Sequence, residues 1–241
     1  MSGLAGARPV RIRKFYSIVG VGEAEGGFSI LLDGKHAKTR AGRPLRLPAR
    51  PLAEAVAAEW AGEGETADLS AMRLTRLAAT AIDLAETDRA RWEGEIASYA
   101  QADLLCYRAE APRELSLRQA AEWTPYLDWA RTSLRAPFVA TEGVVAVVQP
   151  DEAIAAVARA AAGLSSWRLV GTWQGAMLTG SAVLALALER RAFAPAELFS
   201  ASLLDARFQS ERWGVDAEAA AREALIEAEF DAAARWLALA P

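Results

Sequence analysis

Over the first fifty residues, apolar and polar positions alternate in the pattern of short β-strands. Lys14–Val19 is aromatic and β-branched, and Phe28–Leu32 follows a pair of glycines. Asp33-Gly34 then predicts a tight hairpin turn, because a type I′ turn requires positive φ at both central residues. Lys35–Arg40 would return as a polar strand, and Leu45–Pro48 would end the unit. The alternation predicts a small sheet with Lys and Arg along one face.

From Pro51 onward the apolar residues recur at helical spacing instead. Leu52, Val56 and Trp60 form one stripe, and Gly62 would end that helix. The same spacing predicts further helices over residues 74–85, 91–103, 115–134 and 151–162. The β-branched run Val144–Val148 favours an isolated strand or a buried extended segment.

The last seventy residues are expected to hold three helices. Residues 178–188 are nearly all apolar and small, which predicts a central buried helix. Two longer helices would cover Pro195–Arg212 and Asp216–Leu239, separated by Gly214. Asp216 can cap the last helix through its side chain.

Together these elements predict an α+β protein, with a small β-rich N-terminal domain followed by a larger all-helical C-terminal domain. The change of pattern falls near residues 63–72, so we assign the domains to residues 1–68 and 69–241. A chain of 241 residues is long enough for one large domain or two small ones.

Charge divides the chain in the same way. Residues 1–50 contain ten Lys or Arg against Glu23, Glu25 and Asp33, a balance of +7 within an overall charge of −4. The remaining residues therefore carry −11, which suggests two surfaces with different partners. The basic sheet, with Phe15, Tyr16 and Phe28, would suit a nucleic-acid-binding module. Alternatively, its Arg and Lys only fill the faces of the strands.

Equipment for catalysis is sparse. His36 is the only histidine and Cys106 the only cysteine, and neither lies in a recognisable triad or zinc pattern. Phosphate-binding glycine loops are absent. Acidic pairs such as Asp205 with Glu211 could serve a hydrolase only if they faced each other across a cleft. We therefore expect no enzyme, no catalytic residues, no cofactor and no metal site.

The chain shows no secretory signal, and its longest apolar run, Gly175–Leu188, is too short to span a bilayer. A single cysteine rules out an internal disulfide and fits a reducing compartment. We expect no membrane span.

Several segments together resemble the assembly chaperones of the F-type ATP synthase catalytic head, the family that holds the alpha subunit. They lie in this order over nearly the full length: Lys14-Phe15-Tyr16, Leu32–Lys35, Leu52–Trp60, Leu74–Leu77, Thr80–Asp83, Asp103–Arg108, Gln119 with Trp123 and Trp129, Phe208-Gln209, Trp213-Gly214 and Asp216–Glu218. Arg73 and Ala206 depart from the pattern, since the family commonly has a proline and an acidic residue at these positions.

The resemblance implies a non-enzymatic chaperone that binds the free alpha subunit and prevents its aggregation until the beta subunit replaces it. It implies a transient client, and we expect no nucleic-acid partner; a monomer is the default expectation. The lack of a transit peptide suggests a cytoplasmic location in bacteria, with the mitochondrial matrix for eukaryotic relatives. Acidic residues near the C-terminal Trp-Gly segment matter in the family. The residues expected to bind the partner are Asp205, Gln209, Glu211, Trp213, Asp216 and Glu218. Phe208 and Trp213 are either anchors for the client or core residues of the joint.

Overall fold

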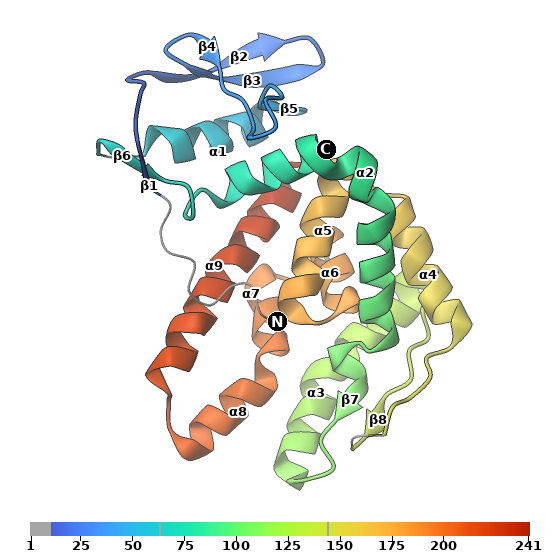
Figure 1. The fold of residues 1–241 in the computed structure, drawn as a ribbon. Coiled ribbons are helices and arrows are strands. Elements are labelled where there is room, and N and C mark those ends of the chain that lie inside the picture. The colour runs from blue at the N-terminus through green and yellow to red at the C-terminus, as the bar shows by residue number, and fades with distance from the viewer. Residues whose placement is uncertain (1–10, 63, 144) are drawn as a thin grey trace.

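The chain folds as an α+β protein, as predicted. The structure, a computed structural model, describes residues 11–62, 64–143 and 145–241. Figure 1 shows a small sheet and helix α1 lying across one end of a larger helical body. No helix in the described part of the chain is both long and apolar enough to cross a membrane. The division into domains at residue 68 stays a prediction.

The N-terminal part contains six short strands and one helix. Strands β2 (Val19–Ala24), β3 (Gly27–Leu32), β4 (Lys35–His36) and β5 (Arg46–Leu47) form an antiparallel sheet with β3 in the middle. Strand β1 (Arg11–Arg13) pairs separately with β6 (Thr66–Asp68). Asp33 and Gly34 have φ of +48° and +78°, which confirms the predicted hairpin turn.

Two predicted strands are wrong in extent. The segment from Lys14 to Ile18 is not a strand, because the Asp33 carboxylate accepts the backbone N–H groups of Ser17 and Ile18 at 2.8–3.2 Å. Those N–H groups are therefore unavailable to a neighbouring strand. The polar strand expected over residues 35–40 is only the two residues of β4.

Helix α1 (Arg50–Ala61) confirms the predicted stripe. Leu52 and Val56 are fully buried and Trp60 is 8% exposed, so this face packs beneath the sheet. The helix ends at Gly62, as expected.

Helix α2 (Arg73–Gln101) is one helix where the sequence predicts two. No Gly or Pro lies between residues 85 and 91, and the ion pair Arg89–Glu93 spans one turn there at 2.8 Å. In Figure 1, α2 begins beneath the N-terminal part and then bends down along the helical body. The two predicted stripes are therefore the two buried stretches of one bent helix.

The remaining elements form the helical body. They are η1 (Leu104–Cys106), β7 (Tyr107–Arg108), α3 (Arg113–Trp129), the π-helical turn η2 (Ala130–Leu134), β8 (Thr141–Glu142), α4 (Asp151–Ala162), α5 (Ser166–Thr179), α6 (Ala182–Glu189), α7 (Pro195–Ser202), α8 (Leu204–Trp213) and α9 (Ala217–Leu239).

Residues 145–148 form neither the isolated strand nor the buried extended segment that the sequence favours. Val144 lies outside the described residues, while Val145 and Val148 are exposed and belong to no strand. The Gln149 side chain binds both the N–H and the C=O of Val139 at 2.9 Å. A side chain thus takes the backbone partners that a second strand would have used.

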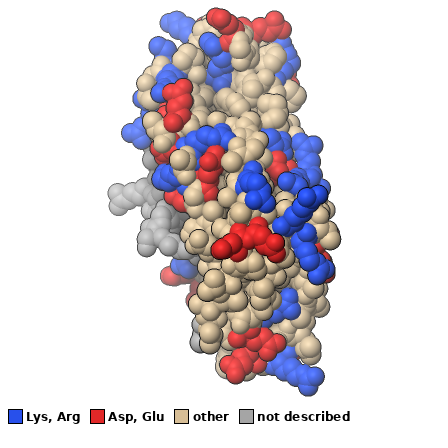
Figure 2. Space-filling model, turned by 90° about the vertical axis from the view of Figure 1, so that its right-hand side faces the viewer, with Lys and Arg blue, Asp and Glu red and all other residues tan. Residues whose placement is uncertain are grey.

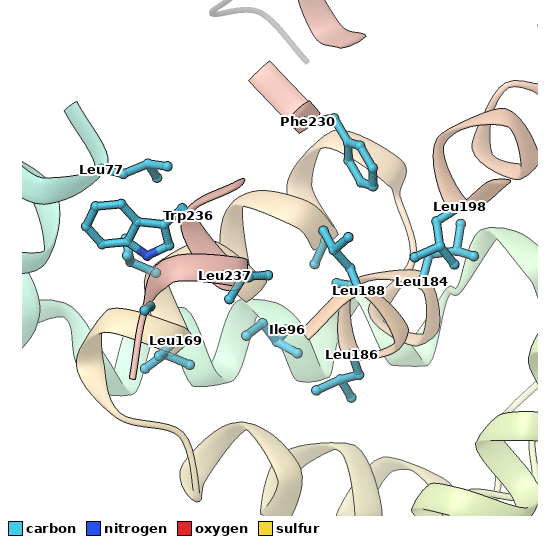
Figure 3. Close-up of a cluster of buried hydrophobic side chains, with 14 of the residues drawn as sticks. Leu77, Ile96, Leu169, Leu184, Leu186, Leu188, Leu198, Phe230, Trp236 and Leu237 are labelled. Atoms are coloured by element: carbon cyan, nitrogen blue, oxygen red, sulfur yellow. The ribbon is translucent and has the colours of Figure 1, made fainter. Parts of the chain in front are cut away.

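The predicted central helix is divided in two. Gly180, with φ of +69°, ends α5, and Ser181 starts α6 by accepting the N–H of Leu184 at 3.0 Å. Every residue of α6 is buried, which confirms the central position of this segment. Figure 3 shows its leucines packed against α2, α5, α7 and α9. Likewise, Pro195–Arg212 is two helices, α7 and α8, because the chain breaks at Leu203.

Candidate functional site

The joint between α8 and α9 is the part of the C-terminal body that is least covered. Every residue from Glu211 to Ala220 is exposed, and we call this segment the α8–α9 tip. In Figure 1 it lies at the end of the helical body away from the sheet.

Two local signals build the tip. Gly214 follows α8 with φ of +88°, a conformation that residues with a Cβ rarely adopt. The Asp216 carboxylate then accepts the N–H of Ala219 at 2.8 Å and caps α9. Both features are as predicted, and together they fix the angle at which the chain turns.

The tip presents apolar side chains to solvent. Trp213 is 82% exposed and Val215 is 74% exposed, whereas Phe208 is 2% exposed. The sequence left open whether Phe208 and Trp213 are anchors for the client or core residues of the joint. Their difference in exposure gives a different answer for each. Phe208 is a core residue, covered by the Arg212 guanidinium at 4.7 Å, while Trp213 is free to contact a partner.

The six predicted partner-binding residues separate into two groups. Gln209, Trp213, Asp216 and Glu218 are exposed at or beside the tip. Asp205, which is half-buried, and Glu211, which is exposed, each bind a residue of α3: Asp205 accepts the Gln119 amide N–H at 2.6 Å, and both carboxylate oxygens of Glu211 accept from Arg118 Nη1 at 2.9–3.0 Å. These two carboxylates therefore hold α8 against α3.

A second ion pair joins α8 to α3, with the cation and the anion exchanged between the two helices. Arg212 of α8 binds Glu114 of α3 at 2.8 Å, so each helix supplies one cation and one anion. Arg118 also contacts Glu122 at 3.1 Å, and hydrogen bonds to Glu211 and Glu122 raise the pKa of its guanidinium. Sequence reasoning did not assign Glu114 and Arg118 to the site. Their spacing of one helical turn was the available signal, since it puts both on one face of α3.

The groups considered for catalysis lie elsewhere. His36 is exposed on β4, with Nδ1 2.8 Å from the Ser29 hydroxyl. Cys106 is buried, and burial together with the nearby Asp103 raises the pKa of its thiol. Within the ranges that the structure describes, no three His, Cys, Asp or Glu side chains are placed to hold a metal ion.

Known proteins match almost the whole length of this chain. The family model of the ATP12 chaperone protein matches residues 13–131. The chain is similar to Atp12 from Paracoccus denitrificans, with 37% identity over 95% of this chain and 98% of that chain and a TM-score of 0.90. It is also similar to a candidate chaperone from Agrobacterium tumefaciens, with 38% identity over 95% of this chain and 86% of that chain and a TM-score of 0.91.

Proposed function

The chain belongs to the ATP12 chaperone family, the assembly chaperones of ATP synthase, and we propose that its client is the free alpha subunit of the catalytic head. It would hold this subunit and prevent its aggregation until the beta subunit replaces it. In this role the chain works as a cytoplasmic monomer without a cofactor and catalyses no reaction.

The observation that carries the proposal is the exposed Trp213 and Val215 at the α8–α9 tip. Apolar side chains exposed to solvent cost free energy in the free protein. Tryptophan is also among the residues most enriched at protein–protein hot spots. A surface that covers a client and later releases it requires a few such anchors within a polar rim.

The carboxylates of the tip supply that rim. Glu218 forms no ion pair within the described part of the chain, and the Asp216 carboxylate accepts one hydrogen bond there, from the backbone N–H of Ala219. We therefore assign Gln209, Trp213, Asp216 and Glu218 to direct contact, with the carboxylates facing Lys or Arg of the client. Asp205 and Glu211 act by holding α8 in place.

Light scattering of isolated alpha subunit on dilution or heating tests the proposal. Wild-type chain should suppress aggregation, while Trp213→Ser and Glu218→Lys should lose most of that protection without unfolding. The matched control is Val148→Ser, which removes an equally exposed apolar side chain from a different surface. If wild-type chain leaves aggregation unchanged, the proposed function is wrong.

The nucleic-acid alternative receives less support. Three of the N-terminal cations are occupied within the protein: Arg43 binds the Ile82 carbonyl, Arg46 the Glu25 carbonyl, and Arg50 the Glu23 carboxylate. On the face shown in Figure 2, Lys and Arg are interspersed with Asp and Glu. A salt-dependent gel shift with RNA or DNA would reverse this preference.

A further inference from the structure

The direction of α8 is not inherited from α7. Trp123 of α3 donates its indole N–H to the carbonyl of Ala201 at 3.0 Å, which fixes the end of α7. The chain then breaks at Leu203, and α8 begins at Leu204. The break removes the rigid connection that a continuous helix would provide. The direction of α8, and of the tip at its end, therefore depends on contacts that α8 makes itself.

The polar contacts between α8 and α3 differ in burial. The two ion pairs lie in the last turn of α8, and their side chains are 37–70% exposed, so water screens them. Leu204 and Phe208 are buried, but apolar packing is not directional. The contact of Asp205 with Gln119 lies in the first turn of α8, and the glutamine is 1% exposed. It is therefore the buried, directional contact that can orient this helix.

Gln119 binds two elements at once. Its amide N–H donates to the Asp205 carboxylate at 2.6 Å, and its carbonyl oxygen accepts the backbone N–H of Ala109 at 2.7 Å. Ala109 directly follows β7, and Figure 1 shows α3 with α8 on one side and β7 on the other. A side chain bound at both ends retains little rotamer freedom. Gln119 therefore keeps Asp205 at a fixed place relative to β7.

The bridge requires a donor at one end and an acceptor at the other. An ionised carboxylate only accepts and a backbone N–H only donates, so an amide satisfies both partners. A glutamate at position 119 would still accept from Ala109, but it would place a second carboxylate oxygen against Asp205. Because the site excludes water, a lost bond here leaves a buried polar group unpaired.

We propose that Gln119 is the positioning residue of the α8–α9 tip. From its fixed place beside β7 it sets the direction of α8, and Asp205 acts through this bridge rather than by touching the client. The inference rests on the proposed function. Without the bridge α8 takes up several directions, and the affinity for the alpha subunit falls with the fraction in which the tip faces the client.

The first test measures the affinity of full-length chain for isolated alpha subunit. Gln119→Glu should weaken binding by about tenfold or more, because two carboxylates then face each other and α8 is released from α3. The matched control is Gln149→Glu. Gln149 is 5% exposed, and its amide likewise accepts a backbone N–H and donates to an oxygen, both of Val139.

The control loses a similar buried hydrogen bond far from α8 in the sequence. Its affinity should stay within about threefold of wild type, because it leaves the bridge intact. Equal losses of affinity in Gln119→Glu and Gln149→Glu would overturn the proposal, since Gln119 would then contribute only to general stability.

The second test exchanges the two groups of the bridge. Gln119→Glu combined with Asp205→Asn keeps both hydrogen bonds and the net charge, since the Asn amide donates to one Glu oxygen and the other accepts from Ala109. This double variant should recover most of the affinity lost in Gln119→Glu, although position 205 no longer carries a charge. A double variant that binds no better than Gln119→Glu would overturn the proposal, because the charge of Asp205 would then act on the client directly.

Amide hydrogen exchange of the free chain tests the bridge without the client. Gln119→Glu should increase exchange in α8 and leave the N–H of Ala109 protected, because that group keeps its acceptor. The double variant should restore the protection of α8. Unchanged exchange in α8 of Gln119→Glu would overturn the bridge, and an increase confined to α8 shows that the rest of the chain stays folded.

The two proposals fail in different ways. If wild-type chain does not bind alpha subunit, the proposed function fails, and the role of Gln119 toward the client fails with it. If wild-type chain binds and Trp213→Ser weakens binding while Gln119→Glu binds as wild type does, only the positioning role of Gln119 is wrong.

Discussion

The two halves of α9 belong to one continuous helix and have opposite environments. Its C-terminal half buries Phe230, Trp236 and Leu237 against the core, as Figure 3 shows. In its N-terminal half, residues 217–222 are all exposed and contain no apolar residue larger than alanine. The large side chains therefore anchor one half, and the other half is free to present the tip.

Stability and recognition of the client therefore depend on different halves of α9. Substitutions in the buried half should change the free energy of unfolding. Substitutions in the exposed half should change client binding while leaving the fold nearly unaffected, because exposed surface residues contribute little to stability.

The largest effect is expected in the buried half. Phe230→Ala should lower the free energy of unfolding by about 3–5 kcal/mol, because it removes a fully buried ring that packs on Phe199 with centroids 5.3 Å apart. Denaturant titration measures it. The matched control is Leu225→Ala, one and a half turns earlier and 51% exposed, which should change stability by less than about 0.5 kcal/mol. Equal losses at the two positions would contradict the separation.

The next effect comes from Asp103, which is fully buried where the body is packed around α6. Its carboxylate accepts the N–H groups of Leu105 and Val183 at 3.0–3.1 Å. Burial outweighs these bonds and raises the pKa of Asp103 to about 6. A raised pKa in the folded state means that its contribution to stability is fully present below about pH 4 and is lost as the pH rises to about 6.

Asp103→Asn provides the measurement. Relative to this variant, the wild-type protein should lose about 2–3 kcal/mol of unfolding free energy between pH 4 and pH 7. Other carboxylates titrate in both proteins, so their contributions cancel in the difference. A difference for Asp103→Asn that is constant with pH would refute the assignment.

Local signals in the sequence predict much of this architecture. Gly214 and Asp216 mark the end of α8 and the cap of α9, and both act through neighbours within four residues. The stripe of α1 and the bounds of α4 are confirmed for the same reason. Such features require only the intrinsic preferences of the backbone and a regular hydrophobic period.

Features that depend on distant partners could not be predicted in this way. The orientation of Glu211 is set by Arg118, 93 residues earlier in the chain, so the sequence could name the carboxylate but not its role. Gln149 replaces a strand partner of Val139 with a side chain, which no β-propensity reveals. The sequence predicts two helices in place of α2 because the two halves of α2 pack in different surroundings.

A smaller effect is expected from the cap at the tip. Asp216→Ala should destabilise the protein by about 0.5–2 kcal/mol, because the N–H of Ala219 loses its acceptor. Amide hydrogen exchange should increase in the first turn of α9 and stay unchanged around Phe230. Asp216→Ser, which can still cap, should restore most of the protection. If exchange increased equally along the whole of α9, its two halves would not be separable.

The smallest effect tests whether Glu211 acts through α3. A double-mutant cycle with Arg118→Ala and Glu211→Ala should give a coupling of about 0.2–1 kcal/mol in unfolding free energy, because the Arg118 and Glu211 side chains are 37% and 57% exposed and the pair is screened by water. The more informative measurement compares the affinities of these three variants for the alpha subunit. If Glu211 only positions α8, Arg118→Ala should weaken binding as much as Glu211→Ala does, and the double variant should add little. A Glu211→Ala loss that Arg118→Ala does not reproduce would mean that Glu211 contacts the client directly, and would add it to the residues of α8 that form the contact surface.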